Sequence, residues 1–106
     1  MQEARARFGL KLRTGFFRTE LYTVEVTGTE LRFIPSGRER GGRGFSFPVG
    51  GIRMAVLLPG RPPELEIRTE SEMLTGSFTD PTELPAATAA LHVVLGARFW
   101  EGDPRM

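Results

Sequence analysis

The sequence contains no cysteine and only one histidine, His92. Without cysteine the chain can form neither disulfide bonds nor thiolate ligands, and a single histidine rules out a histidine-rich zinc site made by this chain alone. An excess of charge is lacking too, because the formal net charge is only +1. No whole-molecule field therefore attracts the protein to nucleic acid or membranes, and any such affinity requires a local patch.

Long apolar runs are also absent. No stretch of the sequence approaches the roughly 18 apolar residues of a membrane-spanning helix. The N-terminal stretch MQEARARFGLKL is charged and lacks the apolar core of a signal peptide. We therefore expect a cytoplasmic protein, and no motif in the sequence predicts a cofactor. The 106 residues suffice for one domain with a single core, with residues 1–6 and 101–106 as loose ends.

Most of the chain shows the alternation of apolar and polar residues that is typical of half-buried strands. The link from Gly28 to Glu30 is short enough for a tight hairpin. Residues 35–44 show no apolar periodicity and are rich in glycine, which predicts a long, mobile loop. Ile52–Leu58 is the most hydrophobic of the predicted strands and the best candidate for a central one. The predicted strands are Arg7–Arg13, Leu21–Thr27, Glu30–Ile34, Phe45–Val49, Ile52–Leu58, Glu64–Arg68 and Met73–Phe78.

One segment near the end of the chain, residues 82–96, has helical rather than alternating periodicity. Either Asp80, with Glu83 completing a capping box, or Thr82 is expected to cap its start. Pro85 favours Thr82, because proline is tolerated only in the donor-free first turn. Gly96 is expected to end the helix. The predicted buried face consists of Leu84, Ala87, Thr88, Leu91, Val94 and Leu95.

Seven strands followed by one helix predict an α+β, mainly β domain, in which the helix covers the strands that precede it. The hairpin of residues 22–34 and the stretches FSFPVGGIRMAVLL and ELEIRTESEMLTGSFTDPTEL resemble those of bacterial pleckstrin-homology-like (PH-like) domains. This resemblance covers residues 7–96. It implies a partly open barrel of two nearly orthogonal sheets with the helix closing one end. Another small barrel or roll with a terminal helix is the alternative.

The resemblance also implies a candidate anion-binding site. The family's headgroup motif has a lysine at the end of the first strand and a basic-x-Arg triplet on the second. Lys11 and Arg13 match its first part and Arg18 begins the second, but Glu20 stands where the last arginine would be. In the PH-like arrangement the loops at one end would gather six cations, with acidic Glu70 and Glu72 opposing them. The six are Lys11, Arg13, Arg18, Arg38, Arg40 and Arg43.

Two aromatic pairs, Phe16-Phe17 and Phe99-Trp100, lie outside the predicted strands and helix. Either they pack back on the barrel, or they form a surface for a protein partner or for self-association. We therefore expect a non-catalytic interaction module that binds a protein partner or itself. The alternative function is weak binding of an anionic membrane surface or of phosphate through the basic loops.

Signals for catalysis are weak. His92 has no nucleophile or ligand near it in sequence, and the pairs Glu64/Glu66 and Glu70/Glu72 are typical of solvated strand faces. The glycine-rich segment of residues 37–44 lacks the Lys-Ser/Thr of a phosphate-binding loop and does not open a helix. Its RGGRG stretch has no interleaved aromatic residues, which disfavours nucleic-acid binding. We therefore do not expect an enzyme.

Overall fold

A computed structural model describes residues 4–36 and 44–102 of the chain. Within these ranges it contains eight strands and one α-helix, with single 3₁₀ turns at residues 49–51, 81–83 and 96–98. The elements are β1 (Ala6–Arg13), β2 (Thr19–Val26), β3 (Glu30–Pro35), β4 (Phe45–Pro48), β5 (Ile52–Leu58), β6 (Glu64–Thr69), β7 (Met73–Phe78), α1 (Leu84–Leu95) and β8 (Phe99–Glu101).

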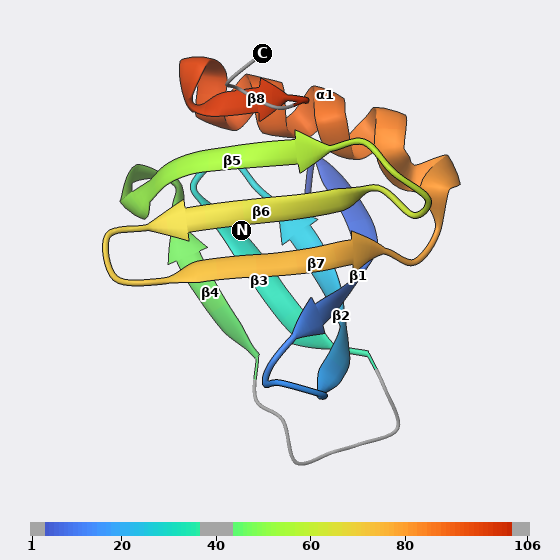
Figure 1. Ribbon diagram of the computed structural model, residues 1–106. Helices are drawn as coiled ribbons and strands as arrows, with labels where there is room; N and C mark the ends of the chain where they lie inside the picture. Colours follow the sequence, from blue (N-terminus) through green and yellow to red (C-terminus); the bar gives the residue numbers. More distant parts are fainter. Residues whose placement is uncertain (1–3, 37–43, 103–106) are drawn as a thin grey trace.

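The strands form one sheet in the order β4-β3-β2-β1-β7-β6-β5-β8. The neighbours are antiparallel except β5 and β8, which are parallel. The sheet folds over on itself: β5, β6 and β7 cross in front of β1 to β4, and α1 lies along the top (Figure 1). This arrangement confirms the predicted α+β barrel with its C-terminal helix at one end.

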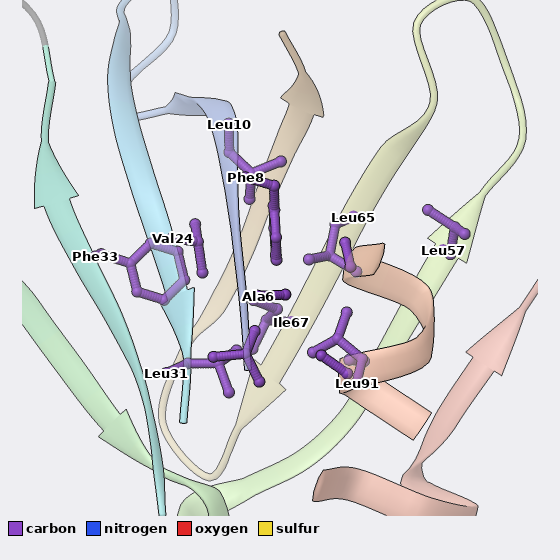
Figure 2. Close-up of a cluster of buried hydrophobic side chains, with 14 of the residues drawn as sticks. Ala6, Phe8, Leu10, Val24, Leu31, Phe33, Leu57, Leu65, Ile67 and Leu91 are labelled. Atoms are coloured by element: carbon purple, nitrogen blue, oxygen red, sulfur yellow. The ribbon is translucent and has the colours of Figure 1, made fainter. Parts of the chain in front are cut away.

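The inward faces of the strands and one face of α1 share a single core. On β1, Phe8, Leu10 and Leu12 are buried and alternate with exposed side chains, as the sequence pattern predicted. Figure 2 shows Leu91 of α1 pointing into this cluster on the side of Leu65 and Ile67. The helix therefore closes the barrel by contributing apolar side chains to the core that the strands enclose.

The two layers of the barrel are joined where β1 meets β7. Only three residue pairs connect these strands, Leu10 with Phe78, Lys11 with Ser77 and Leu12 with Gly76. A Cβ atom at position 76 would lie 2.7 Å from Leu12 Cδ2 and 3.2 Å from the Lys11 carbonyl oxygen. Glycine at this position therefore allows the close approach of β1 to β7.

The start of the helical segment follows the Asp80 alternative. The Thr82 N–H (3.0 Å) and the Thr82 hydroxyl (2.6 Å) both donate to Asp80 Oδ1. These two bonds, the hydroxyl's foremost, lower the pKa of Asp80. Glu83 does not complete a capping box; its Oε1 instead accepts the Gly9 N–H of β1 at 2.9 Å. Since β7 diverges from β1 beyond Leu10, the carboxylate satisfies a donor that the sheet leaves free.

The end of α1 is fixed at Gly96, which has a φ of 58°. The chain then makes one 3₁₀ turn, in which Arg98 Nη1 donates to the carbonyl oxygens of Val49 (2.9 Å) and Ile52 (2.7 Å). This side chain ties the end of the helix to the turn before β5. The chain is thereby directed back along β5, where β8 begins.

The β8 strand was not predicted from the sequence. Phe99, Trp100 and Glu101 pair in parallel with Ala55, Val56 and Leu57 of β5. Phe99 is buried in the core, whereas Trp100 is 43% exposed. Phe99 therefore packs back on the barrel, whereas Trp100, the other member of this pair, lies on the surface. β5 is next to the edge strand rather than in the middle of the sheet, so its prediction as a central strand was wrong.

We expect Leu91→Ala to lower the free energy of unfolding by roughly 2–5 kcal/mol, because it leaves a cavity where a fully buried side chain joins helix and sheet. Val93→Ala is the matched control, since Val93 is 64% exposed on the same helix. Its change should stay within about 0.5 kcal/mol. Urea unfolding of both variants measures the difference, and equal losses would contradict the assigned helix face.

We expect Glu83→Ala to destabilise the fold by roughly 1 kcal/mol, because it removes the acceptor of the Gly9 N–H. Glu83→Gln keeps an oxygen that can accept this bond and should retain most of the stability. Chemical denaturation compares the two variants, and hydrogen exchange at the Gly9 amide should accelerate in the alanine variant only. Unchanged exchange at Gly9 in that variant would show that the carboxylate does not hold this donor.

Candidate interaction site at the open end of the barrel

The loop between β1 and β2, residues 14–18, lies at the end of the barrel away from α1 (Figure 1). We call it the aromatic loop, because the exposed fractions of Phe16 and Phe17 are 101% and 100%. Pairing of β1 with β2 continues as far as Arg13 and Thr19, and the Thr14 N–H donates to the Arg18 carbonyl oxygen at 2.9 Å. The loop is therefore a tight turn that holds both rings in solvent.

Beside this loop the barrel is hollowed into a pocket of about 500 Å³. We call it the mouth pocket. It combines the ends of β1 and β2 with β4 and with the turn into β7. Its lining residues are Leu12, Arg13, Thr14, Tyr22, Phe45, Ser46, Phe47, Glu72 and Leu74. The pocket and the aromatic loop share Thr14, so the two features are contiguous on the surface.

Aromatic side chains form one wall of the mouth pocket. Phe45 stacks on buried Phe33 with ring centroids 4.8 Å apart, and Tyr22 meets Phe45 edge-on at 5.4 Å. Phe47 stands edge-on to both phenylalanines, at 5.9 Å from Phe33 and 5.7 Å from Phe45. Aromatic pairs in these geometries are favourable beyond the area that they bury. The wall is thus a packed set of rings that presents apolar surface to an occupant.

Two charged side chains line this pocket, Arg13 and Glu72. Arg13 Nη2 is 3.0 Å from Glu64 Oε2, so its charge is compensated by a neighbouring carboxylate. The Tyr22 hydroxyl donates to Glu20 Oε2 at 3.0 Å. Burial first, and the Glu20 hydrogen bond and charge second, raise the pKa of Tyr22. Glu72 is exposed at the turn between β6 and β7.

Three of the six candidate anion-binding cations lie at this end of the barrel. Lys11 and Arg13 both point outward from β1, and Arg18 is exposed where the aromatic loop ends. Lys11 and Arg18 have no ion-pair partner among the described residues. Glu20 pairs across the sheet with Leu12 and so lies on the inner side of β2. Arg38, Arg40 and Arg43 lie outside the described residues, as does most of the loop predicted at residues 35–44.

Of the residues that line the mouth pocket, the sequence indicated Arg13 and Glu72 but not the aromatic wall. The alternation of Phe45 and Phe47 predicted a strand with both side chains on one face. They line a pocket because β4 is the edge strand and is paired with β3 alone. Glu20, which stands where the motif's last arginine would be, adjoins the pocket through its hydrogen bond with Tyr22.

At the other end of the barrel, His92 takes part in a local contact of α1 with β8. Its Nε2 lies 2.6 Å from Glu101 Oε2, and its ring stands edge-on to Phe99 at 4.7 Å. Among residues 4–36 and 44–102, no group of three histidine, aspartate or glutamate side chains could hold a metal ion. Within the same ranges, no helix has the length and apolar character needed to cross a membrane.

The only tyrosine of the chain gives a direct probe of the pocket rim. We expect the absorbance titration of Tyr22 in the folded protein to have a midpoint above 10.0, because burial and Glu20 favour the neutral phenol. Glu20→Gln should lower this midpoint without removing the effect of burial. Since the folded state holds the proton more tightly, stability should fall as the pH rises through the raised pKa. If Glu20→Gln left the titration midpoint of Tyr22 unchanged, the result would contradict the Tyr22–Glu20 hydrogen bond.

No protein-family model and no curated protein matches the sequence. Solved structures are similar in fold. The C-terminal domain of an unknown protein from Leishmania infantum has a TM-score of 0.70 and 14% sequence identity, over 89% of this chain and 85% of that one. The N-terminal PH domain of the human ARAP2 protein has a TM-score of 0.64 and 13% identity, over 84% and 76%.

The PH domain from TgAPH is similar as well, with a TM-score of 0.63 and 18% identity over 86% of this chain and 83% of that one. At identities this low the likeness concerns the fold and not the ligands. It agrees with the strand order and the terminal helix that the resemblance in sequence implied. The chain therefore has a PH-like fold.

Proposed function

We propose that this chain is a non-catalytic interaction module of the cytoplasm that binds a protein partner, or a second copy of itself, through the aromatic loop. The observation that carries the proposal is the complete exposure of Phe16 and Phe17 on a tight turn. Adjacent large apolar side chains at the tip of a loop are typical of residues that become buried in a partner. The mouth pocket beside them extends the same surface.

The free energy of burying the two rings limits how much the aromatic loop can contribute to binding. Burial of one phenylalanine side chain is worth about 1.5–3 kcal/mol, so the pair offers about 3–6 kcal/mol. Association costs at least about 4 kcal/mol in lost translational and rotational freedom. The two rings alone therefore support only weak binding, and a partner must also contact the neighbouring pocket or its charged rim.

Weak contact with anionic lipid or phosphate is the second candidate function. It is favoured by Lys11 and Arg18, which are exposed at the same end and have no ion-pair partner among the described residues. Each basic residue near an anionic membrane contributes about 1 kcal/mol. Glu72 in the pocket lining and Glu20, which binds the Tyr22 hydroxyl, oppose such binding. Arg38, Arg40 and Arg43 would strengthen it, and the resemblance to bacterial PH-like domains supports their participation.

Replacing Phe16 and Phe17 with serine distinguishes these functions. We expect the double variant to lose capture of a protein partner from an extract of the native host, and wild-type capture to persist at high salt, because apolar contacts are not screened. Val93→Ser is the matched control, an exposed apolar side chain on α1 at the far end. Sedimentation with anionic vesicles that is lost at physiological salt would indicate the second function. Partner capture unchanged by the double variant would refute the first.

A further inference from the structure

Two complementary surfaces lie at the same end of this barrel. One is convex, with the Phe16 and Phe17 rings on a tight turn; the other is the concave, aromatic-walled mouth pocket. A pocket of about 500 Å³ is large enough for a small ligand or a bulky side chain. The aromatic loop thus carries the chemical groups that the adjacent pocket is suited to accept.

The charges of these two surfaces are also opposite. Arg18 ends the aromatic loop, is exposed, and has no ion-pair partner among the described residues. Glu72 lies at the pocket rim and is equally without an ion-pair partner in the described ranges. Glu20 accepts a hydrogen bond from the Tyr22 hydroxyl beside the pocket. Since the charge of Arg13 is compensated by Glu64, the loop offers an unpaired positive charge and the pocket an unpaired negative one within the described residues, which is a pattern that orients an association.

The aromatic loop does not fill the pocket of its own chain. Strand pairing reaches Arg13 and Thr19, and the Thr14–Arg18 hydrogen bond closes the turn within five residues. Neither ring lines the pocket, and both are fully exposed. The loop is thus free to enter the pocket of another molecule.

We propose that the occupant is a second copy of this chain. Two molecules meet open end to open end about a two-fold axis, and each places the aromatic loop in the mouth pocket of the other. The arrangement satisfies the rule for a closed dimer, because the same patch is used twice and residue i of one copy contacts residue j of the other and vice versa. This inference rests on the proposed function and names the partner within it.

The aromatic rings supply most of the area of this interface. Each phenylalanine side chain buries roughly 200 Å², so the four rings of a dimer remove roughly 800 Å² from water. The pocket walls that they cover add to this area. The smallest class of specific complexes buries less than about 1,200 Å² in total. The exchange of loops therefore supports a weak dimer, which the opposite charges of Arg18 and Glu72 help to orient.

Sedimentation velocity of the untagged chain over a range of concentrations tests the proposal. We expect the wild type to shift from monomer to dimer and Phe16→Ser/Phe17→Ser to remain monomeric, with Val93→Ser behaving as the wild type does. Arg18→Glu and Glu72→Arg should each weaken dimerisation by about tenfold or more, because each places like charges opposite one another at two symmetric contacts. Circular dichroism melts confirm that all variants remain folded.

Mixing the two charge variants gives the sharper result. An equimolar mixture of Arg18→Glu and Glu72→Arg should form a dimer, because opposite charges face each other at both contacts of the mixed pair. A wild type that is monomeric at all concentrations would overturn the proposal. So would a dimer whose affinity does not change in the Phe16→Ser/Phe17→Ser variant, or an equimolar mixture of the charge variants that fails to dimerise. A monomeric wild type whose capture of a host protein still requires Phe16 and Phe17 would overturn the dimer and leave the proposed function intact.

Discussion

The contact between β1 and β7 is the constraint on which the rest of the structure depends. Three residue pairs join the two layers of the barrel there, whereas β1 pairs with β2 along its full length. Gly76 allows the close approach, Phe8 stacks on Phe78 with centroids 5.2 Å apart, and Glu83 binds the backbone of Gly9. Each of these contacts brings a residue from the last third of the chain against the first strand.

The same contact determines where the candidate site forms. Because β1 leaves β7 after Leu12, the two layers separate toward the end that carries the aromatic loop. The opposite edge of the sheet, β4, is paired with β3 alone, so Phe45 and Phe47 face a space that neither β7 nor α1 fills. At the other end that space is occupied by Leu91 and its neighbours on α1. One end of the barrel is therefore closed by the helix and the other is a pocket.

Much of this fold could be predicted from the sequence because burial imposes a local pattern on each strand. The alternation of Phe8, Leu10 and Leu12, or of Leu65 and Ile67, records which side of the strand faces the core. β8 could not be predicted in this way, because three residues are too few for a period to be recognised. Its pairing depends on Gly96 and Arg98, which turn the chain back to β5 only once the helix is in place.

The candidate site was only half predictable for a related reason. Phe16 and Phe17 stood out because large apolar residues are unexpected in a short connection, and this is a local property of the sequence. The mouth pocket is formed by residues from four separate parts of the chain. Tyr22 and Phe47 have the pattern of ordinary core residues, and only the absence of a covering element in the described structure distinguishes them. The alternation of apolar and polar residues within one strand does not indicate whether another element covers its apolar face.

The β1–β7 contact also constrains the order in which the chain can fold. Leu12 and Gly76 are more than sixty residues apart, so their pairing carries a large loop-closure entropy that local hairpins do not. During synthesis β1 to β3 leave the ribosome before β7 and α1 and can form their hairpins, but the apolar face of β1 then has no opposing layer. That face remains exposed until β7 and α1 have emerged. The interval between the two events is the period in which the nascent chain is most open to aggregation or to protection by a chaperone.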